Sequence, residues 1–335
     1  MRDFLDVAHK LWQLDKFREY EDDFRRVFNG IASLQLVHSK SQLDITNIES
    51  VFAAFEMGKL LNKFPNHNKR EIIGLNNSIR ILISKTIEKT IKFLIFQKVI
   101  MPPEPYKDFV DLIVFLNKKA RPQHTVSVIT FNYDLSCDYA FAHRGIRPNY
   151  SLRKESNTDE IPLLKLHGSL NWAFCPQKKT IVSWNLEEYF KSHSALLNNE
   201  KYVYLPISSQ LGEFKYDGNF VKPEPIIVPP TWNKTSQQIQ LSNVWARAAK
   251  ELGESENIIV IGYSLPESDY FFKYLFSLGS VGNTVLERFW VFDPDNSGGV
   301  KRRFQNLLGT GAIARFSYFE KSFEQSILLL TKEFS

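Results

Sequence analysis

The sequence has few cysteines, no long apolar run and no apolar leader, and each shortage excludes a class of protein. Only Cys137 and Cys175 are present among 335 residues, too few for a disulfide framework or a four-thiolate zinc site. No apolar stretch approaches the roughly 18 residues of a membrane span. Asp3 and Asp6 lie where a signal peptide needs apolar residues. We therefore expect a cytoplasmic protein with reduced cysteines and no membrane partner.

The sequence also has little net charge and no charge runs. Lys and Arg number 42 and Asp and Glu 37, which gives a net charge of +5. A polybasic arm for nucleic acid would need a run of like charges, and the sequence has none. We expect no specific nucleic-acid partner, whereas a mild positive charge suits an anionic small molecule.

The first 120 residues show helical periodicity. Phe4, Ala8 and Leu11 recur at spacings of three and four, and a longer apolar stripe predicts a helix over about residues 75–96. Aromatic residues make up 14% of the chain, which indicates a substantial core. We expect residues 1–120 to form a helical module, and its apolar surplus favours self-association.

The pattern changes at Thr125, near the start of the second predicted domain, after which short apolar runs alternate with helical segments. This alternation predicts a parallel sheet covered by helices over residues 121–335. Residues 175–223 break the rhythm and are interpreted as an insertion. The strand-like runs are residues 126–130, 163–166, 226–228, 258–261 and 289–292.

Polar residues and glycines follow four of these runs. Ligands of open α/β sheets bind beyond the carboxyl ends of the strands, so these positions predict a binding site. They are Asn132 and Asp134, His167 and Ser169, Gly262 and Ser264, and Asp293.

The same four turns resemble a known family. ITFNYD, LKLHGSLNW, VIGYSLPESD and VFDPD follow the order seen in the sirtuin superfamily. They are most similar to the bacterial sirtuin-like branch of NAD-consuming antiphage defence proteins, as are the NIES and PPTWNK segments. The resemblance implies a Rossmann-like parallel sheet, with the helical module inserted into it or packed on it. It also implies that the protein binds NAD and breaks the bond between nicotinamide and ribose.

The resemblance assigns roles in the reaction to three residues. Asn132 corresponds to an asparagine that hydrogen-bonds ribose and the attacking water, because an amide both donates and accepts. His167 corresponds to a general base at a ribose hydroxyl, for which an ordinary pKa near 6.5 is suitable. Asp134 either joins this catalytic network or caps the helix that follows it.

Further residues are implied as contacts of NAD. Gly168 and Ser169 follow the histidine, and Gly262 and Ser264 form a Gly-x-Ser turn that approaches the cofactor. Asp293 is placed to accept hydrogen bonds from the hydroxyls of the adenosine ribose.

Two departures from the family pattern bear on activity. The zinc module of sirtuin deacylases is missing, since one cysteine remains in residues 175–223, so we expect no metal. The first strand and its Gly-rich phosphate loop are also missing. Either Met1 is an internal methionine of a longer reading frame or the loop has been lost, and we expect the chain as written to bind NAD weakly and to hydrolyse it slowly or not at all.

Three functions follow from the resemblance. The first is hydrolysis of NAD to nicotinamide and ADP-ribose by an NAD-depleting effector of bacterial antiphage defence. The second is a non-catalytic sensor or scaffold that binds NAD or ADP-ribose, and the third is a sirtuin-type protein deacylase, which the missing cysteines disfavour. We expect NAD as substrate and either homo-oligomers or a partner defence protein as the trigger.

Overall fold

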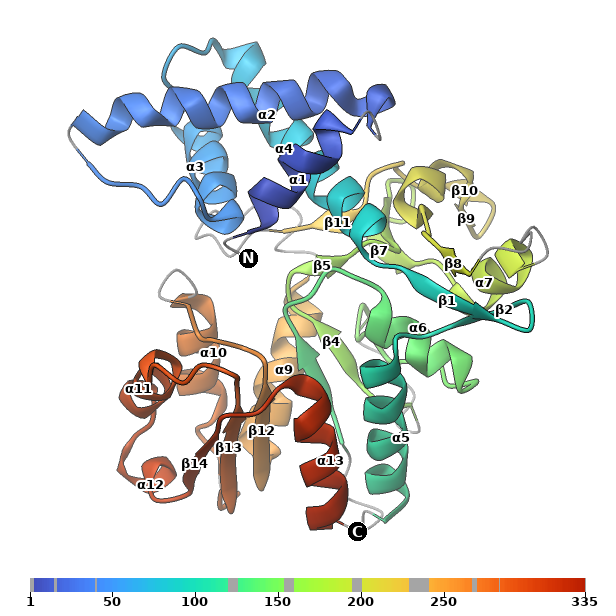
Figure 1. Ribbon diagram of the computed structural model, residues 1–335, viewed down its shortest axis with the longest axis vertical. Coiled ribbons are helices and arrows are strands. Elements are labelled where there is room, and N and C mark those ends of the chain that lie inside the picture. Colours follow the sequence, from blue (N-terminus) through green and yellow to red (C-terminus); the bar gives the residue numbers. More distant parts are fainter. Residues whose placement is uncertain are drawn as a thin grey trace. The chain divides into compact units, whose positions relative to one another are not determined.

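The protein is a mixed α/β chain (Figure 1), and the computed structural model describes nine stretches of it. They are residues 3–14, 17–39, 41–119, 126–153, 160–194, 201–228, 241–266, 270–282 and 284–334. The chain divides into two compact units, each with its own buried hydrophobic residues. The first unit comprises Met1–Ile100, Asn132–Leu135 and His167–Gln240, and the second comprises Met101–Phe131, Ser136–Leu166 and Leu241–Ser335. The predicted domain division at residue 120 and the predicted insertion stay predictions.

Four α-helices begin the first unit, as the periodicity predicted. Asn47 caps α3 by accepting a hydrogen bond from the N–H of Glu49 at 2.9 Å. Asn68 and Glu71 form a reciprocal capping box at the start of α4. The helices are α1 Phe4–Gln13, α2 Glu21–Leu34, α3 Ile48–Leu61 and α4 Lys69–Thr90, with short 3₁₀ turns at Arg18–Tyr20 and Gln35–Ser39.

The helices pack closely through a glycine. A methyl group added to Gly30 of α2 would lie 2.6 Å from Leu75 Cδ2 and 2.8 Å from Phe55 Cζ. Both neighbours are fully buried, so only glycine allows α2 to approach α3 and α4 this closely.

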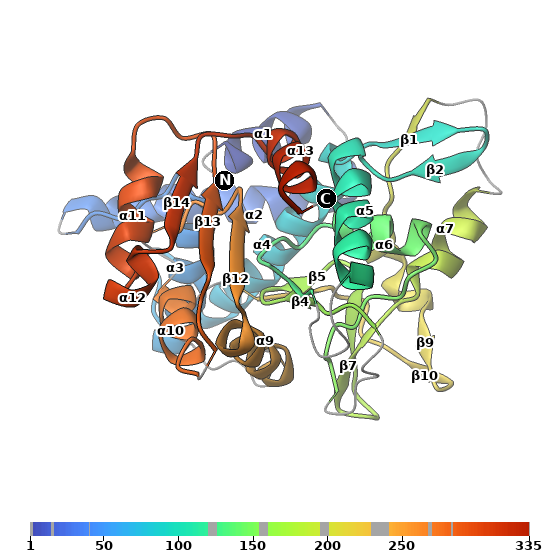
Figure 2. The ribbon, with the colours of Figure 1, turned by 90° about the horizontal axis from the view of Figure 1, so that it is seen from below.

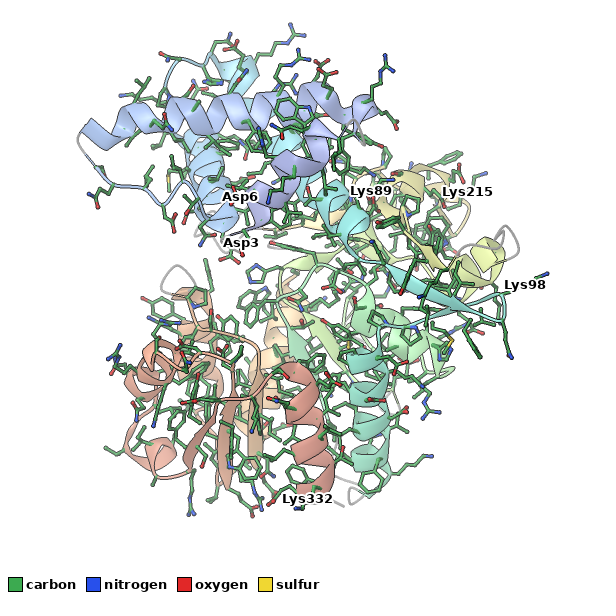
Figure 3. The ribbon with its side chains drawn as sticks, in the orientation of Figure 1. Asp3, Asp6, Lys89, Lys98, Lys215 and Lys332 are labelled. Carbon is green, nitrogen blue, oxygen red and sulfur yellow. The ribbon has the colours of Figure 1, made fainter. Side chains whose placement is uncertain are left out.

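The prediction of a helix as far as residue 96 is wrong at its end. Helix α4 stops at Thr90, and the chain continues as a hairpin of β1 Phe93–Phe96 and β2 Val99–Met101. Gln97 and Lys98 have φ of 50° and 62°, the left-handed pair that a two-residue hairpin turn requires, and Lys98 projects at its tip (Figure 3). Strand β1 also pairs with β8, Tyr202–Val203, a contact too distant in sequence to leave a local signal.

The rest of the first unit consists of short antiparallel elements. Strand β5 pairs with β11 in antiparallel register, so the expectation of a parallel strand at 226–228 is wrong. The elements are β5 Gly168–Ser169, β6 Trp172–Cys175, β7 Thr180–Ser183, α7 Leu186–Ser194, a 3₁₀ helix Ile207–Glu213, β9 Lys215–Tyr216, β10 Asn219–Phe220 and β11 Ile226–Ile227.

The second unit holds the parallel strands, and here the predicted alternation of strand and helix is confirmed. Strands β3 and β4 form one parallel ladder, and β12, β13 and β14 form another. The sheets are therefore smaller than the single predicted sheet. The elements are α5 Glu104–Lys119, β3 Val128–Thr130, α6 Ser136–His143, β4 Leu163–Lys165, α9 Ser242–Glu254, β12 Asn257–Ile261, α10 Tyr270–Gly279, β13 Arg288–Phe292, α11 Gly299–Leu307, α12 Thr310–Ile313, β14 Phe316–Phe319 and α13 Phe323–Phe334.

Helices cover both faces of the three-stranded ladder. Phe292 of β13 packs in a cluster with Leu112 of α5 and Leu330 of α13. Phe289, on the opposite face, contacts the rings of Phe276 in α10 and Phe304 in α11. Figure 2 shows α10 and α13 on opposite sides of these strands. The carboxyl ends of β12 and β13 are thereby held in a fixed frame.

Candidate functional site

The predicted site residues fall into two groups, each within one compact unit. The first group belongs to the first unit and the second group to the second unit. The first group is Asn132, Asp134, His167, Gly168 and Ser169, and the second is Gly262, Ser264 and Asp293.

His167 is the best defined residue of the first group. Its side chain is 5% exposed, and its Nδ1 lies 3.2 Å from the carbonyl oxygen of Val228. The backbone N–H of Val228 donates in turn to the His167 carbonyl at 2.9 Å. Because a carbonyl oxygen can only accept, Nδ1 must carry the hydrogen, so in the neutral ring Nε2 bears the lone pair. This tautomer gives His167 a proton-accepting atom.

Tyr133 forms part of the same arrangement. Its hydroxyl donates to the Val228 carbonyl at 3.1 Å, and its ring meets that of His167 edge-on with centroids 6.1 Å apart. The N–H of Leu170 donates to the Tyr133 carbonyl at 3.1 Å. Tyr133 is not one of the residues predicted from the sequence to form the site, although it lies inside the NYD motif, between Asn132 and Asp134.

Tyr133 thus holds the segment that carries the two predicted partners of His167. Asn132 is exposed and Asp134 is half-buried. Helix α6 begins at Ser136, two residues after Asp134, so this position is compatible with a helix-capping role and with a place in the catalytic network.

Gly168 allows two strands to approach more closely than any other residue would. Its φ is +95°, and an added methyl group would lie 2.8 Å from the carbonyl carbon of Ile226 and closer still to its oxygen. Glycine is therefore required here for both conformation and space. Ser169 is fully buried and donates to Asn171 Oδ1 at 2.8 Å, so its hydroxyl already has a partner within the protein.

The second group lies at the carboxyl ends of β12 and β13. Gly262 has a φ of +66°, and its N–H donates to the carbonyl of Phe292 at 2.8 Å. Arg303 of α11 donates from Nε to the carbonyl of Ser264 at 2.9 Å. The Gly-x-Ser turn is thus tied to β13 and α11. Arg303 gave no signal in the sequence because its partner is a backbone atom 39 positions away.

Asp293 is 7% exposed, and its Oδ1 accepts a hydrogen bond from the N–H of Asp295 at 2.9 Å. Asp295 in turn lies just before α11 and accepts from the N–H of Val300, in the first turn of that helix, at 2.8 Å and from the hydroxyl of Ser297 at 2.5 Å. These hydrogen bonds, that of Ser297 foremost, lower the pKa of Asp295 to about 2. The start of α11 therefore already holds an anion that belongs to the protein.

A buried ion pair lies at the end of β4, shortly before His167 in sequence. Lys165 Nζ lies 2.7 Å from Asp138 Oδ2, and each side chain is 1% exposed. The hydroxyl of Tyr150 donates to the other carboxylate oxygen at 2.8 Å. Such a pair fixes β4 against α6 but does not by itself constitute a reactive site.

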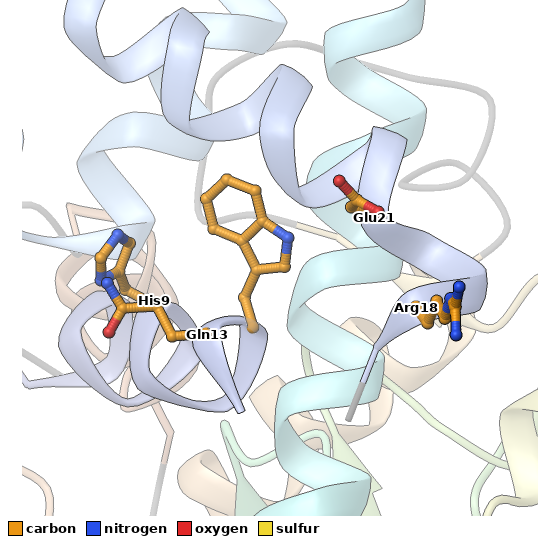
Figure 4. A pocket seen from close by; sticks show the side chains of 5 residues that line it. His9, Gln13, Arg18 and Glu21 are labelled. Carbon is orange, nitrogen blue, oxygen red and sulfur yellow. The ribbon is translucent and has the colours of Figure 1, made fainter. Parts of the chain in front are cut away.

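A separate hollow of about 510 Å³ lies at the start of the first unit (Figure 4). Its lining consists of His9, Trp12, Gln13, Arg18 and Glu21, and includes none of the predicted site residues.

Metal ligands and membrane segments were sought in the described stretches. Within them, no three His, Cys, Asp or Glu side chains are grouped so that they could hold a metal ion. Neither Cys137 nor Cys175 forms a disulfide within these stretches. Over the same residues, no helix has the length and apolar character needed to cross a bilayer.

Three solved Sir2 structures are similar to the chain. A Sir2 homolog in complex with NAD has a TM-score of 0.39 and 15% identity, and the match covers 84% of this chain and 85% of that one. Sir2 in complex with the inhibitor EX-527, 2′-O-acetyl-ADP-ribose and a deacetylated p53 peptide has a TM-score of 0.35 and 14% identity, covering 71% and 75%. A third, from work on the mechanism and regulation of Sir2 enzymes, has a TM-score of 0.32 and 14% identity, covering 69% of each chain. No protein-family model matches the chain, and no curated protein does.

Proposed function

We propose that the protein hydrolyses NAD to nicotinamide and ADP-ribose, with His167 and Asn132 as the central residues. The observation that carries the proposal is the hydrogen bond from His167 Nδ1 to the Val228 carbonyl, 3.2 Å long. It leaves the Nε2 lone pair of a neutral histidine as a base, in the motif where the sirtuin-like sequence pattern expects one. Asn132, exposed on the segment held by Tyr133, supplies an amide that both donates and accepts.

The reaction assigns a task to each of these groups. The bond between ribose C1′ and the nicotinamide nitrogen breaks, and its electron pair leaves with neutral nicotinamide. A water oxygen bonds to C1′ of the oxocarbenium-like ribose, and one proton is released. In this proposal His167 takes a proton from a ribose hydroxyl, and that hydroxyl regains a proton from the attacking water as the water oxygen bonds to C1′, so that the one released proton leaves through His167. Asn132 orients the ribose and the attacking water.

The proposal extends to substrate contacts and biological setting. Gly168, Ser169, Gly262, Ser264 and Asp293 contact NAD, and Asp134 supports the catalytic pair. In a bacterial cytoplasm, such an activity would deplete NAD as an effector of antiphage defence. We further propose that self-association or a partner defence protein triggers it.

The test is release of nicotinamide and ADP-ribose from NAD by the purified chain, followed by chromatography. His167→Asn keeps a donor near the position of Nδ1 but removes Nε2, so activity should fall by roughly 10²–10⁴-fold while the fold is retained. Asn132→Ala should lose activity and keep part of its NAD affinity. His143→Ala and Asn219→Ala are matched controls outside the candidate site and should leave turnover unchanged.

Each alternative predicts a different outcome of the same assay. Binding of NAD without nicotinamide release would identify a non-catalytic NAD or ADP-ribose sensor. Loss of acetyl groups from an acetylated peptide, dependent on NAD, would identify a deacylase. Full activity in His167→Asn would overturn the proposed mechanism.

A further inference from the structure

The first unit contains an arginine whose contacts lead directly to the candidate base. Arg80 of α4 is 13% exposed at its side chain, and its Nη2 lies 2.5 Å from Oε1 of Glu56, which is 1% exposed. Its Nη1 donates to the carbonyl of Asn76 at 3.1 Å, and its guanidinium carbon lies 5.3 Å from the centre of the Phe52 ring. A planar guanidinium held on three sides has little freedom to reorient.

A third donor of Arg80, its Nε, points at β11. This Nε donates to the carbonyl oxygen of Ile227 at 3.3 Å. That oxygen belongs to the same peptide group as the N–H of Val228, which donates to the His167 carbonyl at 2.9 Å. Because a peptide group is planar, fixing both of its ends fixes its plane. Arg80 and the His167 backbone thus hold one peptide plane between them.

This plane fixes the position of the Val228 Cα, from which the next carbonyl along the chain projects. The Val228 carbonyl accepts from His167 Nδ1 at 3.2 Å and from the Tyr133 hydroxyl at 3.1 Å. Its two acceptor directions are therefore both in use. A displacement of the Ile227–Val228 peptide would move the Val228 Cα and carry this carbonyl away from the imidazole, which removes the bond that holds the hydrogen on Nδ1.

We infer that Arg80, supported by Glu56, is a positioning residue that holds His167 in the Nδ1–H tautomer through β11. The inference rests on the proposed function only for its effect on turnover, since the tautomer is a property of the protein alone. Because Arg80 lies on α4 and Glu56 on α3, these two helices would also help to orient the candidate base. Outer partners that orient metal-bound histidines typically change activity by roughly 10–100-fold when they are removed, and we expect an effect of the same order here.

The experiment compares Arg80→Met with a matched control. Arg247→Met removes another arginine from an ion pair of 2.5 Å, with Glu251 on α9 of the second unit. Arg80→Met should lower kcat for nicotinamide release by roughly 10–100-fold with little change in KM, and Arg80→Lys should recover part of it because one donor returns. Arg247→Met should leave both constants unchanged.

The second measurement does not depend on turnover. In ¹⁵N-labelled protein, long-range proton–nitrogen correlations distinguish the two neutral tautomers of a histidine ring. Wild type and Arg247→Met should show His167 with the hydrogen on Nδ1, and Arg80→Met should show a mixture with the Nε2–H form. If Arg80→Met does not fold, Glu56→Gln, which keeps an acceptor oxygen but removes the charge, should show the same change in weaker form.

The outcomes separate the inference from the proposed function. An unchanged tautomer in folded Arg80→Met or Glu56→Gln overturns the inference, whatever the turnover. A changed tautomer in a protein whose wild type releases no nicotinamide supports the positioning of His167 and contradicts NAD hydrolysis.

Discussion

At Gly168, the addition of a single methyl group should strongly destabilise the candidate site. Its φ of +95° disfavours any residue with a Cβ, and the methyl group would also press on the Ile226 carbonyl. The conformational cost is about 1–2 kcal/mol, and overpacking against a rigid neighbour adds about 1–3 kcal/mol. Gly168→Ala should therefore lose about 2–5 kcal/mol of unfolding free energy.

Gly218 provides a control that separates the two costs. Its φ is +74°, and no described atom lies within 4 Å of the position of an added Cβ. Gly218→Ala should lose only the conformational part, about 1–2 kcal/mol. Urea unfolding followed by tryptophan fluorescence measures both variants.

Gly168→Ala should also lose activity, because relief of the clash displaces β11 and with it the Val228 carbonyl. The variant should release nicotinamide much more slowly than Gly218→Ala under conditions where both are folded. If the two variants have the same stability and the same turnover, β5 and β11 do not approach as closely as described, and the account of how His167 is held fails.

Three further predictions concern other parts of the molecule. Lys165→Met leaves the Asp138 carboxylate buried without its cation and should lower the free energy of unfolding, measured in urea, by about 3–5 kcal/mol. The double variant Lys165→Met/Asp138→Leu should recover most of this stability. If the double variant is as unstable as Lys165→Met, the ion-pair explanation is wrong. Asp295, with its pKa lowered to about 2, adds stability that is complete above its ordinary pKa of 3.8 and is lost as the pH falls through about 2. The difference in Tm between wild type and Asp295→Ala should therefore shrink on acidification over that window, and a constant difference would refute the assignment. Elemental analysis should find less than one zinc per chain, since Cys137 and Cys175 cannot build a four-thiolate site; one tightly held zinc would return the deacylase to consideration.

The elements that could be predicted from sequence are those whose signal is local. The stripe of apolar residues predicted the helix α4. The short apolar runs predicted β3, β4, β12 and β13, with bounds within a few residues of those observed. The predicted end of this helix was wrong because Gln97 and Lys98 adopt a hairpin-turn conformation without the glycine that usually indicates such a turn in a sequence. The parallel direction expected for residues 226–228 was wrong because β11 pairs with β5, a strand of only two residues that carries no periodicity.

The candidate site divides in the same way. Its chemistry-bearing residues could be proposed from sequence because they follow strands and lie in recognisable motifs, as His167 and Asn132 do. The groups that orient them could not. Val228 acts through its carbonyl, 61 positions from His167, and Arg80 acts on a carbonyl 147 positions away. Backbone acceptors have no side-chain signature, so only the folded chain brings these partners together.

The shared peptide group between Ile227 and Val228 has a consequence for how this region tolerates mutation. This peptide group contacts Arg80 and His167 only through its own backbone atoms, while the side chains of Ile227 and Val228 are both buried. Leucine, isoleucine and valine should therefore exchange at these two positions with modest loss. Proline at position 228 is the exception, since it has no N–H to give to His167. In a substitution scan over apolar residues, β11 would thus behave like any other buried strand. Only the intolerance of proline at position 228 would indicate that its backbone orients the histidine.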